Sequence, residues 1–154
     1  MRIGVLSDSH GSTGRISTLL MMMEADGPLD AIIHLGDGYH DLSDLGVPLP
    51  PVYQVAGNCD FFRSDTRLTV NFSQTLLLLT HGHLQNVKQG RDQLFDLAKE
   101  ARVHAILYGH THVQKMEWRE GILLLNPGAA FDRRCAVLTI SRPGVIDVKL
   151  YGDA

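Results

Sequence analysis

The stretch Met1-Arg-Ile-Gly-Val-Leu-Ser-Asp8-Ser9-His10-Gly11 decides the fold. Its apolar part contains Ile3, Val5 and Leu6, which suit a buried strand. The strand is followed at once by Asp8-Ser9-His10-Gly11. An acid and an imidazole two residues apart at the end of a strand can turn toward one point, and an oxygen ligand beside a nitrogen ligand suits Mn, Fe or Zn. The stretch therefore predicts an α/β protein with a metal site.

The bulk composition limits the class of protein. The chain has 154 residues, of which 44% are hydrophobic and 20% charged, so we expect residues 1–154 to form a single domain with a sizeable core. A formal net charge of −3 argues against a protein that binds duplex nucleic acid. The longest apolar runs, at 76–79 and 122–125, are too short to cross a membrane. With no export signal, and with Cys59 and Cys135 far apart and interpreted as thiols, we expect a cytoplasmic location.

Apolar runs and helical patterns alternate along the chain. Ile16, Leu19, Leu20 and Met23 follow helical spacing, and a second apolar run at 30–35 implies a parallel strand reached by a right-handed crossover. His34 lies inside that run, where we expect a buried, hydrogen-bonded side chain. Further strands are expected at 52–56, 67–72, 74–80 and 103–108, a second helix from a cap at Asn86, and hairpins at 113–125 and 136–150.

Five apolar runs end in polar clusters. In open α/β sheets, ligands bind beyond the carboxyl ends of the strands, so the five clusters are expected to meet at one edge. Glycines beside the clusters allow the backbone to turn sharply there. The clusters are Asp8-x-His10, Gly36-Asp37, Gly57-Asn58, His81-Gly82-His83 and His110-x-His112.

The clusters supply enough donors for two metal ions. One such motif alone could equally serve to satisfy a loop backbone, whereas five together favour a metal site. One ion takes about four to six ligands, so seven donors with one shared carboxylate suit two ions about 3.5–4 Å apart. The seven candidate ligands are Asp8, His10, Asp37, Asn58, His81, His110 and His112.

The order of these motifs resembles the calcineurin-like metallophosphoesterase superfamily. The short chain, Gly57-Asn58-Cys59-Asp60 and Asn126-Pro127-Gly128 resemble its small bacterial and archaeal phosphodiesterase subgroup. The resemblance implies a four-layer α/β/β/α sandwich with the metal site at the C-terminal ends of the strands.

The resemblance also assigns the ligands. It implies that one ion is held by Asp8, His10, Asp37 and His112, and that Asp37 bridges to a second ion. The second ion is then held by Asp37, Asn58, His81 and His110. Mn is the favoured metal, with Ni, Fe or Zn as alternatives, and the substrate is a small phosphodiester, with nucleotides among the candidates. His83 receives no ligand role.

One position departs from the superfamily pattern. Many members carry a histidine followed by an acid after Gly-Asn, and that histidine helps the leaving group or steadies the phosphate. Here Cys59 stands in its place and Asp60 keeps the acid. Cys59 and Asp60 are therefore the candidate catalytic residues. Whether Cys59 takes part in the chemistry or only fills the space is open at this point.

These features predict a metal-dependent phosphoesterase, more specifically a phosphodiesterase that uses a hydroxide held by two metal ions. The alternative is a metal-binding scaffold for protein interactions with little catalysis, because a fold does not fix a function. A hydrolase with a Ser or Cys nucleophile has little support, since no Gly-x-Ser-x-Gly motif is present. Phe61-Phe62 is expected to be ordinary packing, with a substrate mouth or a homo-oligomer contact as alternatives.

Overall fold

Two mixed β-sheets form the centre of the protein. The computed structural model describes residues 1–61 and 65–152. The first sheet has the strand order β10-β9-β1-β2-β3, and the second has the order β4-β5-β6-β8-β7. The strands of the first sheet are β1 (Arg2–Leu6), β2 (Ala31–His34), β3 (Val52–Gln54), β9 (Cys135–Arg142) and β10 (Val145–Tyr151). Those of the second are β4 (Arg67–Phe72), β5 (Thr75–Thr80), β6 (Ala105–Leu107), β7 (Lys115–Arg119) and β8 (Ile122–Asn126).

Each sheet combines three parallel strands with two antiparallel ones. β1, β2 and β3 run parallel in the first sheet, while β9 and β10 are antiparallel additions. β5, β6 and β8 run parallel in the second sheet, while β4 and β7 are antiparallel. The parallel strands of both sheets therefore deliver several loops to one edge, as the sequence predicted.

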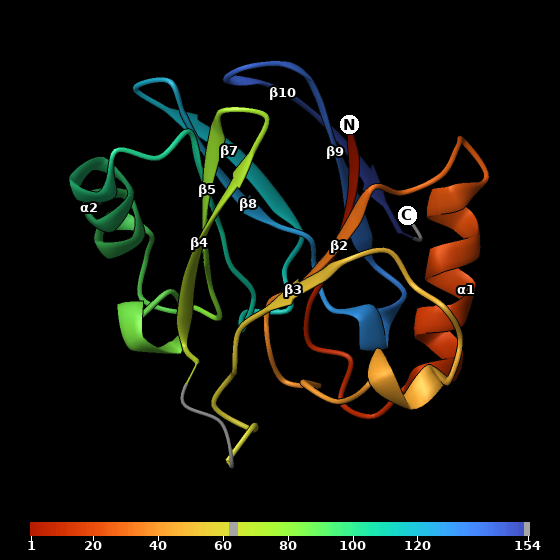
Figure 1. Cartoon of the computed structure of the whole chain (residues 1–154). Helices are drawn as coiled ribbons and strands as arrows, with labels where there is room; N and C mark the ends of the chain where they lie inside the picture. The colour runs from red at the N-terminus through yellow and green to blue at the C-terminus, as the bar shows by residue number, and fades with distance from the viewer. Residues whose placement is uncertain (62–64, 153–154) are drawn as a thin grey trace.

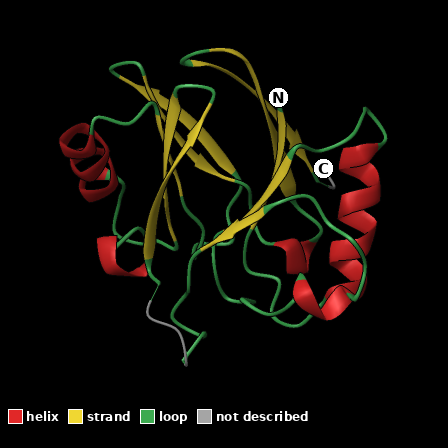
Figure 2. Cartoon of the chain, in the orientation of Figure 1, coloured by secondary structure: helices red, strands yellow, loops and turns green. Residues whose placement is uncertain are grey.

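One α-helix covers the outer face of each sheet, as Figures 1 and 2 show. Helix α1 (Thr13–Glu24) packs on the first sheet and helix α2 (Asp92–Ala101) on the second. Three short 3-10 helices complete the described elements: η1 (Ser43–Leu45), η2 (His83–Gln85) and η3 (Ala130–Asp132). The layers thus follow the expected α/β/β/α order. In the described ranges, no helix is both long and apolar enough to cross a membrane.

The apolar strands are buried on both faces. On β1, Ile3 and Val5 point into the core between the sheets, while Leu6 joins the core under α1. Gly4 lies on the α1 side, where an added Cβ would come within 3.0 Å of the Met23 sulfur. The close approach of α1 to β1 therefore needs glycine at this position, and two-sided burial explains why these strands are apolar throughout.

The predicted start of the second helix is wrong. Asn86 ends η2 in a left-handed conformation, and α2 begins only at Asp92. Between them the chain turns again at Gly90, whose φ is +146°. Val87 is buried as expected, but it packs from this loop rather than from the helix.

Candidate metal centre

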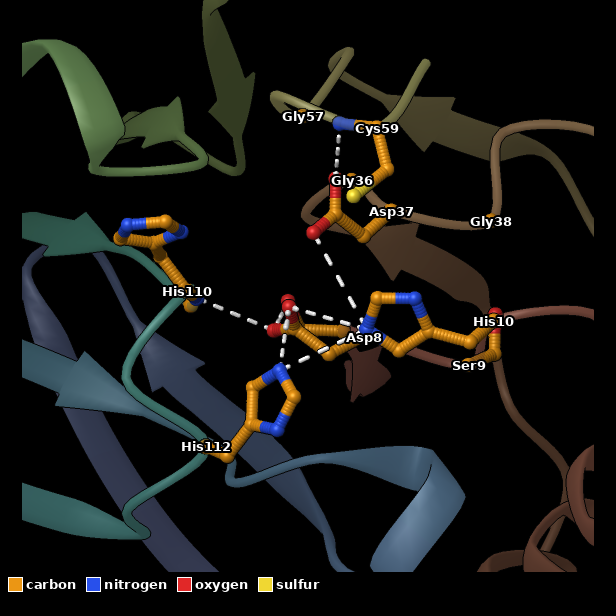
Figure 3. Close-up of polar contacts among 12 residues, drawn as sticks. Asp8, Ser9, His10, Gly36, Asp37, Gly38, Gly57, Cys59, His110 and His112 are labelled. Carbon is orange, nitrogen blue, oxygen red and sulfur yellow. Dashed lines mark hydrogen bonds and ion pairs between the residues drawn. The ribbon is translucent and has the colours of Figure 1, made fainter.

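The strand ends bring the predicted ligands together. Asp8 and His10 follow β1, Asp37 follows β2, His81 follows β5, and His110 and His112 follow β6. Figure 3 shows Asp8, His10, Asp37 and His112 turned toward one central space, with the backbone of His110 beside Asp8. Three groups have donor atoms within 4.8 Å of one another: Asp8, His10 and His112; Asp37, His81 and His110; and His10, Asp37 and Cys59.

The carboxylate of Asp8 is fully buried and only half satisfied. Its Oδ2 accepts hydrogen bonds from Ser7 Oγ at 2.5 Å and from the backbone N–H of His110 at 3.0 Å. Its Oδ1 is buried without a hydrogen-bond partner. This oxygen lies 3.2 Å from Nε2 of His112, 3.8 Å from Nε2 of His81 and 3.9 Å from Nε2 of His10. A buried, unpaired carboxylate oxygen facing three ring nitrogens fits a bound cation.

Asp37 lies near histidines of two of these groups, His10 in one and His81 in the other. Its Oδ1 accepts the backbone N–H of Cys59 at 2.8 Å. Its Oδ2 lies 3.3 Å from Nε2 of His81 and 3.9 Å from Nε2 of His10. One oxygen is thus oriented by the β3 loop, while the other lies between histidines of both groups. This geometry suits a carboxylate shared by two ions.

The histidine rings are oriented for binding from one side. Nδ1 of His81 donates a hydrogen bond to the Leu35 carbonyl at 2.8 Å, which leaves Nε2 free to face the carboxylates. That Nε2 lies 3.2 Å from Nδ1 of His110. On the other side of the centre, Nε2 of His10 and Nε2 of His112 are 3.4 Å apart. Close pairs of ring nitrogens are what a shared metal ion would produce.

The electrostatic field of the centre favours positive charge. Burial lowers the pKa of His81, but the carboxylates of Asp37 and Asp8 outweigh burial, so the net pKa is raised. Burial raises the pKa of Asp37, yet its contact with His81 more than offsets this and holds the carboxyl well below its usual range. The Asp37 carboxylate is therefore ionised at neutral pH and ready to bind a cation.

Five candidate ligands have an unusual backbone conformation. The φ values are 54° at Asp8, 47° at His10, 59° at Asp37, 71° at His110 and 62° at His112. Such positive values are uncommon for residues other than glycine and cost free energy. Strain gathered at the ends of three strands supports a functional role for these loops.

Glycines permit the close approach of the loops. A Cβ on Gly109 would lie 2.0 Å from Ser7 Oγ and 2.6 Å from Asp8 Oδ2. A Cβ on Gly57 would lie 2.2 Å from Asp37 Oδ1. Both loops therefore touch the carboxylates through bare backbone.

Comparison with known proteins identifies the family to which the chain belongs. Residues 1–142 match the model of the calcineurin-like phosphoesterase superfamily domain. The chain belongs to this superfamily. A Bacillus subtilis relative named "Probable metallophosphoesterase YsnB" is 35% identical over 132 residues, which cover 84% of this chain and 75% of that protein.

One further sequence relative and one solved structure extend the comparison. The phosphodiesterase MJ0936 of Methanocaldococcus jannaschii is 26% identical over 170 residues, covering 97% of this chain and 94% of that protein. The solved structure of Vps29 from Entamoeba histolytica, in complex with Zn²⁺, has a TM-score of 0.74 at 18% identity and covers 98% of each chain. The last comparison shows the shared fold alone.

In this superfamily member, Asp60 connects two loops. Its Oδ2 accepts backbone N–H groups from Asp37 and Gly57, each at 2.7 Å, and its Oδ1 accepts those of Gly38 at 3.1 Å and Tyr39 at 3.2 Å. Because both oxygens are used by the backbone, the geometry supports a positioning role rather than a direct chemical one.

Asn58 and Cys59 of the Gly-Asn-Cys-Asp motif are exposed, whereas Gly57 is buried. Cys59 Sγ belongs to the group formed with His10 and Asp37, and Nδ2 of Asn58 lies 3.6 Å from that sulfur. Burial and the nearby Asp37 carboxylate raise the pKa of the Cys59 thiol. Phe61 is 84% exposed, so packing is the wrong interpretation for it, while Phe62 lies outside the described residues.

Behind the centre lies a polar network that was only partly expected. His34 is buried and hydrogen-bonded, as predicted: its Nε2 is 2.8 Å from Ser9 Oγ, and its Nδ1 accepts the Gly36 N–H at 3.1 Å. Ser9 Oγ also donates to Asp41 Oδ2 at 2.6 Å, and that oxygen accepts the Gly11 N–H. Ser9 and Asp41 were missed, and only the position of Ser9 inside Asp8-x-His10 pointed to such a role.

His83 and His40 lie around the centre without joining the groups of possible ligands. The ring of His83 lies 5.5 Å from that of His81 and 6.1 Å from that of His110. His40 is exposed, and its ring packs edge-on against that of Tyr39.

Proposed function

We propose that this protein is a metal-dependent phosphodiesterase that uses two divalent ions. The observation that carries the proposal is the buried Oδ1 of Asp8, which has no hydrogen-bond partner and lies within 3.9 Å of ring nitrogens from three histidines. Membership of the phosphoesterase superfamily and the similarity to a protein named phosphodiesterase support the same reaction.

The residues divide into two ligand sets in this proposal. Asp8, His10, Asp37 and His112 would hold one ion, and Asp37, Asn58, His81 and His110 the other. When bound, the ions supply Lewis-acid chemistry, because they polarise the phosphoryl group and make hydroxide available from water at neutral pH. Mn is the proposed metal, and the mixed nitrogen and oxygen donors also accept Ni, Fe or Zn.

The protein's own part in this reaction is to hold and orient. Asp60 holds the loops of Asp37 and Gly57 together through four backbone bonds. The Leu35 carbonyl fixes the His81 ring so that Nε2 faces the centre. In the metal-free protein, burial and the Asp37 carboxylate raise the pKa of Cys59, so there its thiol is a weak hydrogen-bond donor beside Asp37 and not an anionic nucleophile.

Cys59 also determines the expected substrate preference. A thiol is a poorer proton donor to a leaving group than an imidazolium. Leaving groups that depart without a proton should therefore react best. The proposal predicts activity on aryl phosphodiesters, with lower rates on alkyl diesters and on plain monoesters.

The test compares bis(p-nitrophenyl) phosphate, methyl p-nitrophenyl phosphate, dimethyl phosphate and p-nitrophenyl phosphate in the presence of Mn. Rates should follow the leaving group among the diesters and be lowest for dimethyl phosphate. Equal rates for aryl and alkyl leaving groups would contradict the role given to Cys59. A preference for the monoester would contradict the assignment as a diesterase.

A scaffold that binds metal and recognises protein partners is the second candidate. The fold similarity to Vps29, which the solved structure shows with Zn²⁺, is the observation that favours it. Under this alternative the protein binds about two ions per chain but turns over none of these esters.

A further inference from the structure

A basic cavity lies beside the metal centre. It has a volume of about 340 Å³ and is lined by residues that include Lys88, Arg91, Tyr108, Thr111 and Lys115. Its walls are the loop that follows η2 and the loop between β6 and β7. The second stretch carries His110 and His112, and His83 lies in η2, just before the first stretch.

The residues that line the cavity are neighbours of the candidate ligands along the chain. Thr111, in its wall, separates His110 from His112 in the sequence. On the opposite wall, Val87 packs against Gly82, where an added Cβ would lie 3.0 Å from it. A molecule bound in the cavity would thus lie beside a substrate at the metal centre.

The lining of the cavity carries positive charge, and two of its three cationic side chains have no carboxylate partner among the described residues. Lys88, Arg91 and Lys115 carry positive charge, and the lining includes no acid. Among the described residues, neither Lys88 nor Lys115 has a carboxylate within ion-pair distance. Arg91 donates its Nε–H to Glu117 at 2.7 Å, and Glu117 also pairs with Arg119, so the nearby acid is already neutralised.

Two hydroxyl groups complete the lining. Tyr108 is 2% exposed, and burial raises its pKa, so its hydroxyl keeps its proton. Thr111 Oγ1 accepts hydrogen bonds from Asn126 Nδ2 at 2.9 Å and from the Val113 N–H at 3.1 Å. With both lone pairs used, the Thr111 hydroxyl has its own hydrogen left to donate. Cations together with neutral donors are the groups that bind phosphate oxygens.

We propose that this cavity is a second anion-binding subsite, and that the physiological substrate is a phosphodiester carrying a further phosphate group. This inference rests on the proposed function. The metal centre takes the scissile diester, and Lys88, Arg91 and Lys115 hold the second phosphate. Diesters with no second anion are poorer substrates, because they leave Lys88 and Lys115 without an anionic partner.

The test uses inhibitors that carry two phosphates. The bisphosphates of linear diols, from ethanediol to hexanediol, are compared with the monophosphates of the same diols, with free metal in excess over inhibitor. At the chain length that spans both sites, the bisphosphate should bind about tenfold more tightly than its monophosphate, as expected for added charge-assisted hydrogen bonds. Binding is measured by calorimetry on the metal-loaded protein and by inhibition of aryl diester hydrolysis.

Matched variants test whether the tighter binding of the bisphosphate depends on the cavity. The double variant Lys88→Gln with Lys115→Gln removes two exposed cations and should abolish the tenfold advantage. Lys99→Gln, which changes an exposed lysine on α2 outside the cavity, should retain it. No advantage at any chain length, or an equal advantage in the double variant, would overturn the subsite.

The calorimetric measurement separates this inference from the proposed function. If the metal-loaded protein prefers a bisphosphate but hydrolyses no ester, the subsite stands and the phosphodiesterase assignment fails. If it hydrolyses aryl diesters but shows no preference for a bisphosphate, the phosphodiesterase assignment stands and the subsite fails.

Discussion

Nε2 of His81 lies 3.3 Å from Oδ2 of Asp37, and the two residues come from different sheets. His81 follows β5 of the second sheet, while Asp37 follows β2 of the first. Each sheet therefore supplies only part of the centre, and the groups meet because the apolar core holds the sheets face to face. Metal binding and the packing of the sheets are accordingly coupled, so a bound metal should stabilise the folded protein.

Asp37→Asn should remove metal binding and also destabilise the metal-free fold, because it removes the charge whose contact with His81 lowers the pKa of this carboxyl. The substitution keeps the shape of the side chain but removes the charge that faces His81 and His10. We expect metal affinity to fall at least about 100-fold and aryl diesterase activity to be lost, since a ligand shared by both ions is changed. Isothermal titration with Mn and thermal unfolding with and without Mn measure both effects. Asp147→Asn, at an exposed position on β10, serves as the control. Unchanged Mn binding in D37N would refute the bridging role.

Asp60→Asn should weaken both the fold and the centre. In the wild type, four backbone N–H groups donate to the two carboxylate oxygens of Asp60. The amide of asparagine replaces one of these acceptor oxygens with an NH₂ donor, so some of the backbone N–H groups lose their acceptor. Leaving such donors unpaired costs about 2 kcal/mol in the free energy of unfolding. Urea denaturation of the metal-free protein measures this loss. A direct catalytic role would instead give a normal unfolding free energy and normal Mn affinity with a reduced kcat.

Cys59→Ser should retain most of the activity. The thiol has a raised pKa, and a protonated thiol is a poor nucleophile. We expect kcat for an aryl diester to change less than about tenfold, and alkylation of Cys59 by iodoacetamide to be slow at neutral pH. Cys135, which is buried, is the internal reference for alkylation. Loss of nearly all activity in C59S, together with a covalent adduct detected by mass spectrometry, would show that Cys59 is a nucleophile.

The stability of the metal-free protein should fall below pH 6.5 because of His34. Burial lowers the pKa of His34 from 6.5 to about 4. Between these values the unfolded chain binds a proton that the folded protein does not, so the folded state loses up to about 1.4 kcal/mol per pH unit as the pH decreases. Above pH 6.5 this contribution does not change with pH.

The comparison of His34→Gln with the wild type isolates this effect. Chelator-treated protein is unfolded with urea at several values between pH 4 and pH 7. The wild type should lose stability more steeply than H34Q, whereas H40Q, changed at an exposed histidine, should behave like the wild type. Parallel curves for the wild type and H34Q would show that His34 does not titrate in this way.

The strands and the polar clusters at their ends were predictable because each depends on residues that are adjacent in the sequence. Apolar runs such as Ile3 to Leu6 indicate buried strands, and a polar cluster after each run indicates a site at the strand ends. The layer order and the convergence of Asp8, Asp37 and His81 followed from this pattern together with the superfamily resemblance.

The remaining features depend on contacts between distant parts of the chain. The four backbone donors of Asp60 come from two loops, and the bonds of Ser9 with His34 and Asp41 join segments about one strand and helix apart. No local pattern encodes such pairings. The start of α2 was misplaced because Asn86 serves as well at the end of a 3-10 turn as at the start of a helix.

The most direct test of the account is hydrolysis of bis(p-nitrophenyl) phosphate by chelator-stripped protein before and after Mn is added, with bound metal counted in the same sample. The account predicts no turnover without metal and clear turnover with about two Mn ions bound per chain. Equal turnover with and without metal would contradict the metal mechanism. Two bound ions without turnover, with Mn, Ni and Zn alike, would show instead that the protein is a metal-binding scaffold.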